Sequence, residues 1–491
     1  MADTISTMNL ASEADTLRIA RRIQGEQQQH WTSSYAARRV HLIGVGGCGM
    51  SGLAGVLLRC GAIVSGSDLV GGEAFNRLEE MGASIRLGQA PINIPRDCDY
   101  VVYSAAIKED NPELVEARRR ELRCLKYSEM LGQVMRQRVG IAIAGTHGKS
   151  TTTALTTYIL RRAKADPTFV VGAQVNQLGG GCGVGDGPHF VVEACEYDRS
   201  FLNLAPKCAA VLNIEEDHLD YYSGLAAIIT AFRAFAMLVP SEGVVIANRE
   251  DENVARALLG IRAPVETFGV RDDAFWQATN IQRARGCYSF DIYRDGEFYL
   301  HASLDNLPGR HQVANVLAAT ALAHHAGIAA DSIAESLSSF AGAHRRMSVC
   351  GEINGILLLD DYGHHPTEIQ VTLLAVREHY PNRRLWVVFQ PHQHSRTRFL
   401  LEDFACSFGQ ADLLLVPDIY FVRDSEAERQ AISSGNLVDR VRANGGDALY
   451  LPTHQAIVEH IGLHAKSGDI VMTMGAGDVW KIGDELIRRL A

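Results

Sequence analysis

The clearest candidate for chemistry is a short glycine loop followed by Lys149 and Ser150. An apolar run over residues 139–144 breaks at Gly145, and a predicted helix begins near Ser150. In this strand, loop and helix order, glycines let backbone N–H groups surround a polyphosphate, and the start of the helix adds positive partial charge. Lys149 would reach the β- and γ-phosphates, and the Ser150 hydroxyl would hold Mg²⁺.

This loop is shorter than the usual phosphate-binding loop. Only Thr146 and His147 lie between Gly145 and Gly148, where the common pattern has four residues. The pattern favours nucleotide binding, and the alternative is an ordinary tight turn before a helix.

A second glycine pattern occurs near the N-terminus. Gly44, Gly46 and Gly49 follow an apolar run and fit G-x-G-x-x-G, and Asp68 closes the next predicted strand, near the position of a ribose-binding acid. Taken alone, the pattern indicates a dinucleotide-binding dehydrogenase. Any nucleotide diphosphate needs the same glycines, however, and a turn that packs a helix close to a strand would also use them.

Polar residues gather after several predicted strands. In parallel sheets such strand ends share one edge, where ligands bind, and acids with an occasional His can complete a Mg²⁺ site there. Solvated loops are the alternative for the first two groups, and structural His–carboxylate contacts for the last two. The four groups are Glu193, Glu196 and Asp198; Asn213, Glu215, Asp217 and His218; Asp361, His364 and His365; and His392, His394, Arg396 and Arg398.

These groups need a scaffold of alternating strands and helices. Such alternation predicts an α/β protein with mostly parallel sheets, and the length of 491 residues predicts roughly three domains. An alternating stretch over 288–300 that turns at Asp295-Gly296 predicts a hairpin, either a cover over the nucleotide or decoration. The predicted boundaries are a flexible or weakly helical N-terminal extension (1–39) and three domains (40–138, 139–346 and 347–491).

Composition excludes several classes of protein. A formal charge of −10 argues against nonspecific nucleic-acid binding, which needs a basic surface. The ten cysteines are scattered, without a Cys-x-x-Cys pair, which indicates reduced thiols in a cytoplasm. No apolar stretch is long enough to span a bilayer, so we expect no membrane association.

Five motifs occur in an order that resembles the Mur ligase family. The resemblance runs from about Val40 to the C-terminus. The motifs lie at 44–52 (GVGGCGMSG), 144–149 (AGTHGK), 213–220 (NIEEDHLD), 360–368 (DDYGHHPTE) and 389–392 (FQPH).

The resemblance implies a Rossmann-like UDP-binding domain, a central ATPase domain and a Rossmann-like C-terminal domain that brings the amino acid. It implies that L-alanine is joined to the lactyl carboxylate of UDP-N-acetylmuramate with ATP and Mg²⁺, through an acyl phosphate. It redirects the first glycine loop from a nicotinamide cofactor to the diphosphate of a UDP-sugar. We expect a cytoplasmic monomer or homodimer.

The resemblance also implies roles for individual residues. Lys149, His364 and Arg346 are expected at the reacting centre. The ATP site is expected at Gly145, Thr146, His147, Gly148, Lys149, Ser150, Thr151, His311, Asn315 and Asp361. The UDP-sugar site is expected at Gly44, Gly46, Gly47, Gly49, Asp68 and Ser104, the amino-acid site at Tyr362, His392 and Arg396, and the metal ligands at Ser150, Glu193 and His218.

The sequence departs from the family pattern at several positions. Ser150 stands where a Thr is usual, and Gln393 stands where an Arg is usual, beside the expected alanine site. These changes leave two alternatives open: a related ligase that adds another amino acid or a recycled peptide, and a non-catalytic paralogue that binds a UDP-sugar. No lysine occurs between Lys207 and Lys466, which excludes the carbamylated lysine of related ligases. The remaining departures are Cys195, Tyr197, Gln312 and Met347.

Overall fold

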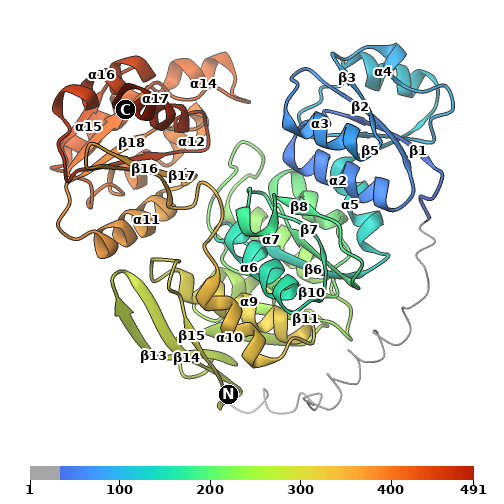
Figure 1. Ribbon diagram of the computed structural model, residues 1–491, viewed down its shortest axis with the longest axis horizontal. Coiled ribbons are helices and arrows are strands. Elements are labelled where there is room, and N and C mark those ends of the chain that lie inside the picture. The colour runs from blue at the N-terminus through green and yellow to red at the C-terminus, as the bar shows by residue number, and fades with distance from the viewer. Residues whose placement is uncertain (1–33, 491) are drawn as a thin grey trace.

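The computed structural model describes residues 34–490, and its strands form three separate sheets (Figure 1). Each sheet is built from one continuous stretch of the chain, so the predicted three-part α/β architecture is confirmed. No helix in the described part of the chain is long and apolar enough to cross a bilayer.

The first sheet is parallel throughout, with strand order β3-β2-β1-β4-β5. Its central strand β1 is buried along nearly its whole length because helices cover both faces. The strands are β1 (Arg39–Ile43), β2 (Ile63–Asp68), β3 (Ser84–Leu87), β4 (Tyr100–Tyr103) and β5 (Arg123–Lys126), and the helices are α2 (Cys48–Arg59), α3 (Glu73–Glu80), α4 (Pro112–Arg119) and α5 (Tyr127–Met135), with a 3₁₀ turn η1 (Pro91–Asn93).

Part of the expected N-terminal extension packs on this sheet. Residues 1–33 lie outside the described residues. Tyr35 is buried, its ring lies 6.0 Å from that of Tyr100, and its hydroxyl donates to Gln133. An aromatic side chain gains enough from such burial to order the segment before β1.

The second sheet has ten strands in the order β15-β14-β13-β12-β11-β10-β6-β9-β7-β8. Its middle is parallel, and antiparallel pairs form both ends. The strands are β6 (Val139–Ala144), β7 (Thr168–Val170), β8 (Cys182–Gly183), β9 (His189–Glu193), β10 (Cys208–Val211), β11 (Val244–Asn248), β12 (Val265–Gly269), β13 (Trp276–Ala284), β14 (Cys287–Arg294) and β15 (Glu297–Ser303).

Two helices of this domain are buried along most of their length, and α6 carries several threonines in that environment. The hydroxyls of Thr153, Thr156 and Thr157 donate to carbonyls one turn earlier, so their burial leaves no polar group unpaired. The helices are α6 (Lys149–Arg162), α7 (Leu225–Ala236), α8 (Glu252–Ala257), α9 (Gln312–His325) and α10 (Ala330–Ser339), with 3₁₀ segments η2 (Asn176–Leu178) and η3 (Tyr197–Asn203).

The third sheet has six strands in the order β16-β17-β21-β18-β19-β20, and only its edge strand β16 is antiparallel. The strands are β16 (Ser348–Ile353), β17 (Ile356–Asp361), β18 (Leu385–Phe389), β19 (Leu413–Val416), β20 (Ala448–Tyr450) and β21 (Ile470–Met474). The helices are α11 (Pro366–His379), α12 (His394–Phe399), α13 (Leu401–Ala405), α14 (Glu426–Ala431), α15 (Ser434–Ala443), α16 (His454–His464) and α17 (Trp480–Leu490).

The predicted hairpin is confirmed, and it touches the C-terminal domain. Strands β14 and β15 turn at Asp295-Gly296, both with positive φ, as a tight hairpin requires. At the other end of β14, Arg283 and Tyr288 both bind Glu378 near the end of α11. Figure 1 shows α11 beside this end of the central domain. The end of β14 opposite this turn, together with the end of β13, therefore contacts α11.

Candidate functional site

The glycine loop after β6 adopts a conformation that needs glycine. Gly145 and Gly148 have φ values of 154° and 80°, and α6 starts at the next residue, Lys149. A Cβ atom added to Gly148 would lie 2.5 Å from Oδ1 of Asn315. The strand, loop and helix order predicted from the sequence is thus present, with Asn315 of α9 packed directly against the loop.

Lys149 is buried in a set of polar contacts. Its Nζ donates to the carbonyls of Gly145 and Thr146 and lies 2.9 Å from Oε1 of Glu196. Burial alone would lower the pKa of Lys149, but the nearby carboxylates, Glu196 above all, more than offset this and raise it. Lys149 therefore stays charged at the mouth of the loop.

Polar atoms beside Lys149 remain unpaired. Oε2 of Glu196 and Nδ1 of His218 are buried and have no hydrogen-bond partner among the described residues. Nε2 of His218 lies 3.7 Å from Oε1 of Glu196, and Glu193 accepts a hydrogen bond from the Gly172 N–H. Buried oxygen and imidazole atoms without partners fit the donor set of a divalent cation.

His147 of the loop connects the central domain to α11. Its Nε2 lies 3.5 Å from Glu215, and its Nδ1 lies 3.4 Å from Glu368 of the C-terminal domain. Burial opposes protonation, but these two carboxylates raise the pKa of His147 to about 9. The positively charged ring is thereby held between two domains.

One group of three potential metal ligands differs from the predicted set. Ligand atoms of His147, Glu215 and His365 all lie within 4.8 Å of one another in the described part of the chain. His365 already donates from Nε2 to the Glu216 carbonyl, and Glu215 accepts from Thr367. We interpret this group as part of the contact between the domains, because its members contact protein groups of both domains.

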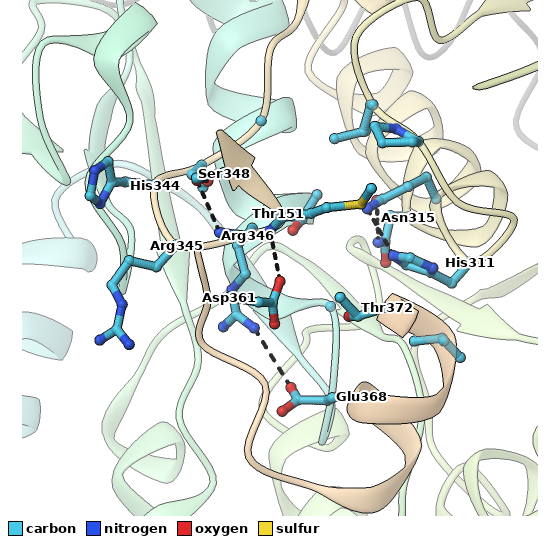
Figure 2. Close-up of a pocket in the computed structure, with 18 of the residues that line it drawn as sticks. Thr151, His311, Asn315, His344, Arg345, Arg346, Ser348, Asp361, Glu368 and Thr372 are labelled. Atoms are coloured by element: carbon cyan, nitrogen blue, oxygen red, sulfur yellow. Dashed lines mark hydrogen bonds and ion pairs between the residues drawn. The ribbon is translucent and has the colours of Figure 1, made fainter. Parts of the chain in front are cut away.

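A cavity of about 770 Å³ opens between the central and C-terminal domains (Figure 2). Six of the residues predicted for ATP line it, together with Arg346 and Glu368. Gly145, Thr146, Lys149 and Ser150 are not among its lining residues; Ser150 is buried in the first turn of α6. The six predicted lining residues are His147, Gly148, Thr151, His311, Asn315 and Asp361.

A chain of amide hydrogen bonds forms one wall of this cavity at the start of α9. Gln312 bonds Nε2 of His311 at 2.9 Å and accepts from Nδ2 of Asn315 at 2.8 Å. Burial lowers the pKa of His311 to about 4, so the ring is neutral. Neutral donors and acceptors suit recognition of a heterocyclic base, and Gln312 fixes their orientation.

Charged residues form the opposite wall, as Figure 2 shows. The Arg346 guanidinium lies 3.7 Å from Glu368, and Asp361 accepts from the N–H groups of Met347 and Gly363, both at 2.7 Å. Burial raises the pKa of Asp361 to about 6 despite these partners. The wall therefore combines one fixed cation with a carboxylate that titrates near neutrality.

The residues predicted to hold the amino acid lie together, but Arg396 is already occupied. The ring of His364 lies 5.4 Å from that of Tyr362 and 6.3 Å from that of His392. Nε and Nη2 of Arg396 both donate to Oδ1 of buried Asp217, at 3.0 and 2.7 Å. Burial lowers the pKa of His364 to about 4 and that of His392 to about 3.

Four of the six residues predicted for the UDP-sugar converge at the end of β1. The Gly46 N–H donates to Asp68 at 2.8 Å, and Ser104 Oγ would lie 3.2 Å from a Cβ added to Gly44, whose φ is 83°. Gly47 and Gly49 belong to the N-terminal end of α2. The Gly46 N–H therefore already has a carboxylate partner within the first domain.

Three family models cover the chain in order. The "Mur ligase family, catalytic domain" matches residues 39–139, the "Mur ligase middle domain" 143–323, and the "Mur ligase, glutamate ligase domain" 345–477. The chain is 40% identical to the UDP-N-acetylmuramate–L-alanine ligase of Caldanaerobacter subterraneus subsp. tengcongensis, over 92% of this chain and 97% of that relative. The chain belongs to the Mur ligase family.

Solved Mur ligases have the same three-domain fold. The UDP-N-acetylmuramate-alanine ligase of Thermotoga maritima superposes with a TM-score of 0.76 at 26% identity, over 92% of this chain and 98% of that one. A murein peptide ligase of Psychrobacter arcticus gives 0.71 at 28% identity, over 92% and 99%. As a Mur ligase, the chain is an ATP-dependent ligase, and the predicted enzyme class is confirmed.

Two further residues organise this Mur ligase site: Glu368, to which the sequence assigned no role, and Asn213, which belongs to one of the polar groups predicted at strand ends. Glu368 contacts both His147 and Arg346, and Asn213 accepts from the His147 N–H. Glu368 lies on the first turn of α11, four residues after His364, which precedes the helix, and Nδ1 of His364 lies 3.5 Å from Glu368. The four-residue spacing of a His and an acid could have revealed this pair.

Proposed function

We propose that the chain joins L-alanine to the lactyl carboxylate of UDP-N-acetylmuramate and forms ADP and phosphate, in cytoplasmic synthesis of peptidoglycan precursors. One observation carries the proposal: the cavity between two domains is lined by the glycine loop, the His311–Asn315 wall and the Arg346–Asp361 wall. The printed names of the relatives support the choice of substrates.

The first step activates the lactyl carboxylate, since oxide is a poor leaving group. The carboxylate attacks the γ-phosphorus of ATP, the bond to the β-phosphate oxygen breaks, and an acyl phosphate forms. Two anions must approach each other in this step. Lys149 and Arg346 lower the repulsion because both remain cationic when buried.

The second step forms the amide bond. The amine of L-alanine attacks the acyl phosphate carbonyl, and phosphate leaves from the tetrahedral intermediate. His364 and His392 are neutral because they are buried, so they do not repel the incoming amino group. His364 lies at the reacting centre, and Tyr362, His392 and Arg396 lie beside the amino acid.

The unpaired atoms beside Lys149 fit a divalent cation. We assign Ser150 and Glu193 to one Mg²⁺ and His218 to a second, and we add Glu196 because its Oε2 has no other partner in the described part of the chain. Bound Mg²⁺ would neutralise phosphate charge. Lys149 keeps the same region positive from within the chain.

The remaining assignments follow the domains. We assign the UDP-sugar to the first domain (40–138), ATP to the central domain (139–346) and the amino acid to the C-terminal domain (347–491). The UDP-sugar ligands are then Gly44, Gly46, Gly47, Gly49, Asp68 and Ser104. The protein would act as a monomer or homodimer, which sedimentation at assay concentration distinguishes.

A substrate panel tests the proposal. Purified protein with ATP and Mg²⁺ should release phosphate only when both UDP-N-acetylmuramate and L-alanine are present. Other amino acids and the tripeptide L-alanyl-γ-D-glutamyl-diaminopimelate are run in parallel. Preference for the tripeptide, or equal phosphate release without the sugar nucleotide, would contradict the proposal.

A further inference from the structure

Glu113, on the first turn of α4, is a fully buried carboxylate that lies outside the candidate site. Ser67 Oγ donates to its Oε2 at 2.5 Å, and Nε2 of His41 lies 3.2 Å from the same oxygen. The Ala90 N–H and Nδ2 of Asn93 donate to its Oε1, at 3.0 and 2.6 Å. A buried carboxylate is costly unless both of its oxygens are paired, and these partners meet that requirement. We refer to the five residues as the Glu113 network.

The carboxylate of Glu113 is charged at neutral pH. Burial alone would raise its pKa, but the hydrogen bonds from His41, Ser67 and Asn93 lower it below its ordinary value. A charged acceptor binds its donors more strongly than a neutral acceptor does. Glu113 therefore fixes the surrounding groups with charge-assisted hydrogen bonds.

Ser67 connects Glu113 to the glycine loop of the first domain. Its carbonyl accepts from the N–H groups of Gly44 and Val45, at 2.8 and 3.0 Å. The next residue, Asp68, accepts from the following N–H of the loop through its carboxylate. Successive side chains of a strand point to opposite faces, so Glu113 holds Ser67 from the face of β2 opposite to Asp68. Movement of this serine and aspartate would displace the acceptors of three consecutive N–H groups in the loop.

Asn93 connects the same carboxylate to the other side of Asp68. Besides its bond to Glu113, Nδ2 of Asn93 donates to the Gly88 carbonyl at 2.9 Å. The Gly88 N–H donates in turn to the Asp68 carbonyl at 2.8 Å. Glu113 thus restrains the backbone of Asp68 from two directions, through Ser67 and through Asn93.

The position of this loop decides where the first N–H groups of α2 point. The N–H groups of residues 44–46 already have acceptors within the protein, whereas Gly47 caps α2 without any side-chain hydrogen bond. The first N–H groups of a helix have no partner within it and attract anions. A diphosphate would therefore meet the end of the loop and the start of α2.

We propose that Glu113 is a positioning residue for the UDP-sugar: it holds Ser67 and Asp68, and these two hold the first glycine loop so that the start of α2 meets the diphosphate. This inference rests on the proposed function for the identity of the ligand. Glu113 does not touch the ligand, because it is fully buried and both of its oxygens are occupied. Its effect is on the affinity for the UDP-sugar, since the transferred phosphoryl group is bound in another domain.

A purely structural role for Glu113 predicts a different result. Loss of a buried network would then lower the Tm and the fraction of folded protein, while the folded molecules would bind the sugar nucleotide with an unchanged Kd. A positioning role changes the Kd itself. Calorimetry separates the two, because unfolded molecules lower the measured stoichiometry, whereas a displaced loop raises the Kd.

Glu113→Met and Glu113→Gln differ in whether they keep the hydrogen bonds. Met fills a similar volume without an acceptor, so it should raise the Kd for UDP-N-acetylmuramate about 10- to 100-fold, as loss of an outer partner that orients a binding group usually does. Gln can accept from Ala90 and Asn93 and donate to the Ser67 hydroxyl, so its Kd should lie within about threefold of the wild type. The KM for ATP should stay within about twofold in both variants, because ATP is assigned to another domain.

Ser67→Ala and Ser65→Ala form a matched pair within β2. The two serines point to the same face of the strand, and each contacts the Glu113 network, since Ser65 Oγ lies 2.9 Å from Nδ1 of His41. The carbonyl that accepts from the loop belongs to Ser67. Ser67→Ala should therefore raise the Kd about threefold to tenfold and Ser65→Ala should leave it within about twofold, although each loses one hydrogen bond.

The outcomes separate the positioning role from the proposed reaction. An unchanged Kd in Glu113→Met, or equal Kd values in the two serine variants, would overturn the positioning role. If Glu113→Met does not fold, the serine pair decides. A wild type that binds UDP-N-acetylmuramate without turnover of L-alanine would overturn the proposed reaction alone, and the Kd ratios would still decide the role of Glu113. A wild type that does not bind the sugar nucleotide would overturn both.

Discussion

Two loops of this protein share one glycine-rich design but differ in the side chains that surround them. In the first domain, the Gly46 N–H donates to Asp68, and the other side chains nearest the loop glycines are uncharged, among them Ser104 and Tyr127. In the central domain, Lys149 pairs with Glu196, and His147 lies between Glu215 and Glu368. The strand, loop and helix order can provide a site for phosphate groups at either loop, whereas phosphoryl transfer also requires cations, and His147 and Lys149 place two of them at the second loop.

Lys149→Ala should have the largest effect and is the strongest test of this comparison. Removal of the cation should lower kcat by about 10³-fold, because one charge at the transferred phosphoryl group is lost. The Kd for the UDP-sugar, measured by calorimetry, should not change. Lys164→Gln, at an exposed residue just after α6, is the control. An unchanged kcat in Lys149→Ala would show that the second loop does not supply a cation needed for phosphoryl transfer.

A matched pair of glycine variants compares the loops directly. Gly148→Ala should raise the KM for ATP about 10- to 100-fold or abolish activity, because φ is 80° and the new Cβ would meet Asn315 at 2.5 Å. Gly46→Ala should raise only the KM for the UDP-sugar, and by less, since its new Cβ would meet Asp68 at 3.0 Å. Steady-state kinetics with each substrate varied separates the two. Equal effects on both KM values in either variant would contradict the comparison.

The His147 contact should depend on pH. Its pKa is raised from 6.5 to about 9, so the ion pairs stabilise the closed domains fully below about pH 6.5 and are lost as the pH rises through 9. With Glu215 36% exposed, we expect only about 1–2 kcal/mol at neutral pH.

Thermal unfolding at pH 7 and pH 9.5 measures this contribution. The wild type should lose about 2 °C more in Tm over this range than His147→Gln does. His464→Gln, at an exposed position, should behave like the wild type. Identical losses in the wild type and His147→Gln would show that the ring is not charged in the folded protein.

Asp68→Asn should have the smallest effect. The amide can still accept from the Gly46 N–H, but it loses the charge assistance, which changes the binding free energy by about 1 kcal/mol. The KM for the UDP-sugar should rise about threefold to fivefold, with no change for ATP. A larger effect on kcat than on this KM would mean that the first loop also takes part in chemistry.

The sequence predicted most of the scaffold because strands and glycine turns have local patterns. The run before Gly145, the helix near Ser150 and the turn at Asp295-Gly296 each depend on neighbouring residues, and the structure has all three. The pairings of Glu368 with His147 and of Arg396 with Asp217 join residues more than 170 positions apart. No local pattern contains such a pairing, since it arises only when the domains meet.

The availability of Arg396 could not be predicted for the same reason. Its residue type and its position after β18 both indicate an anion-binding role. Only the packing of the C-terminal domain against the loop after β10 shows that Asp217 already binds it. Similarly, the unpaired amide of Gln393 becomes evident only once all its neighbours are in place.

Helix α11 is attached to the central domain at both ends. Glu368 on its first turn contacts His147, and Glu378 near its last turn binds Arg283 of β13 and Tyr288 of β14. A rigid body that is held at two points can turn only about the line that joins them, and here that line runs along a helix roughly 20 Å long. Rotation about this line must also break the buried Arg396–Asp217 pair, which joins the same two domains away from α11.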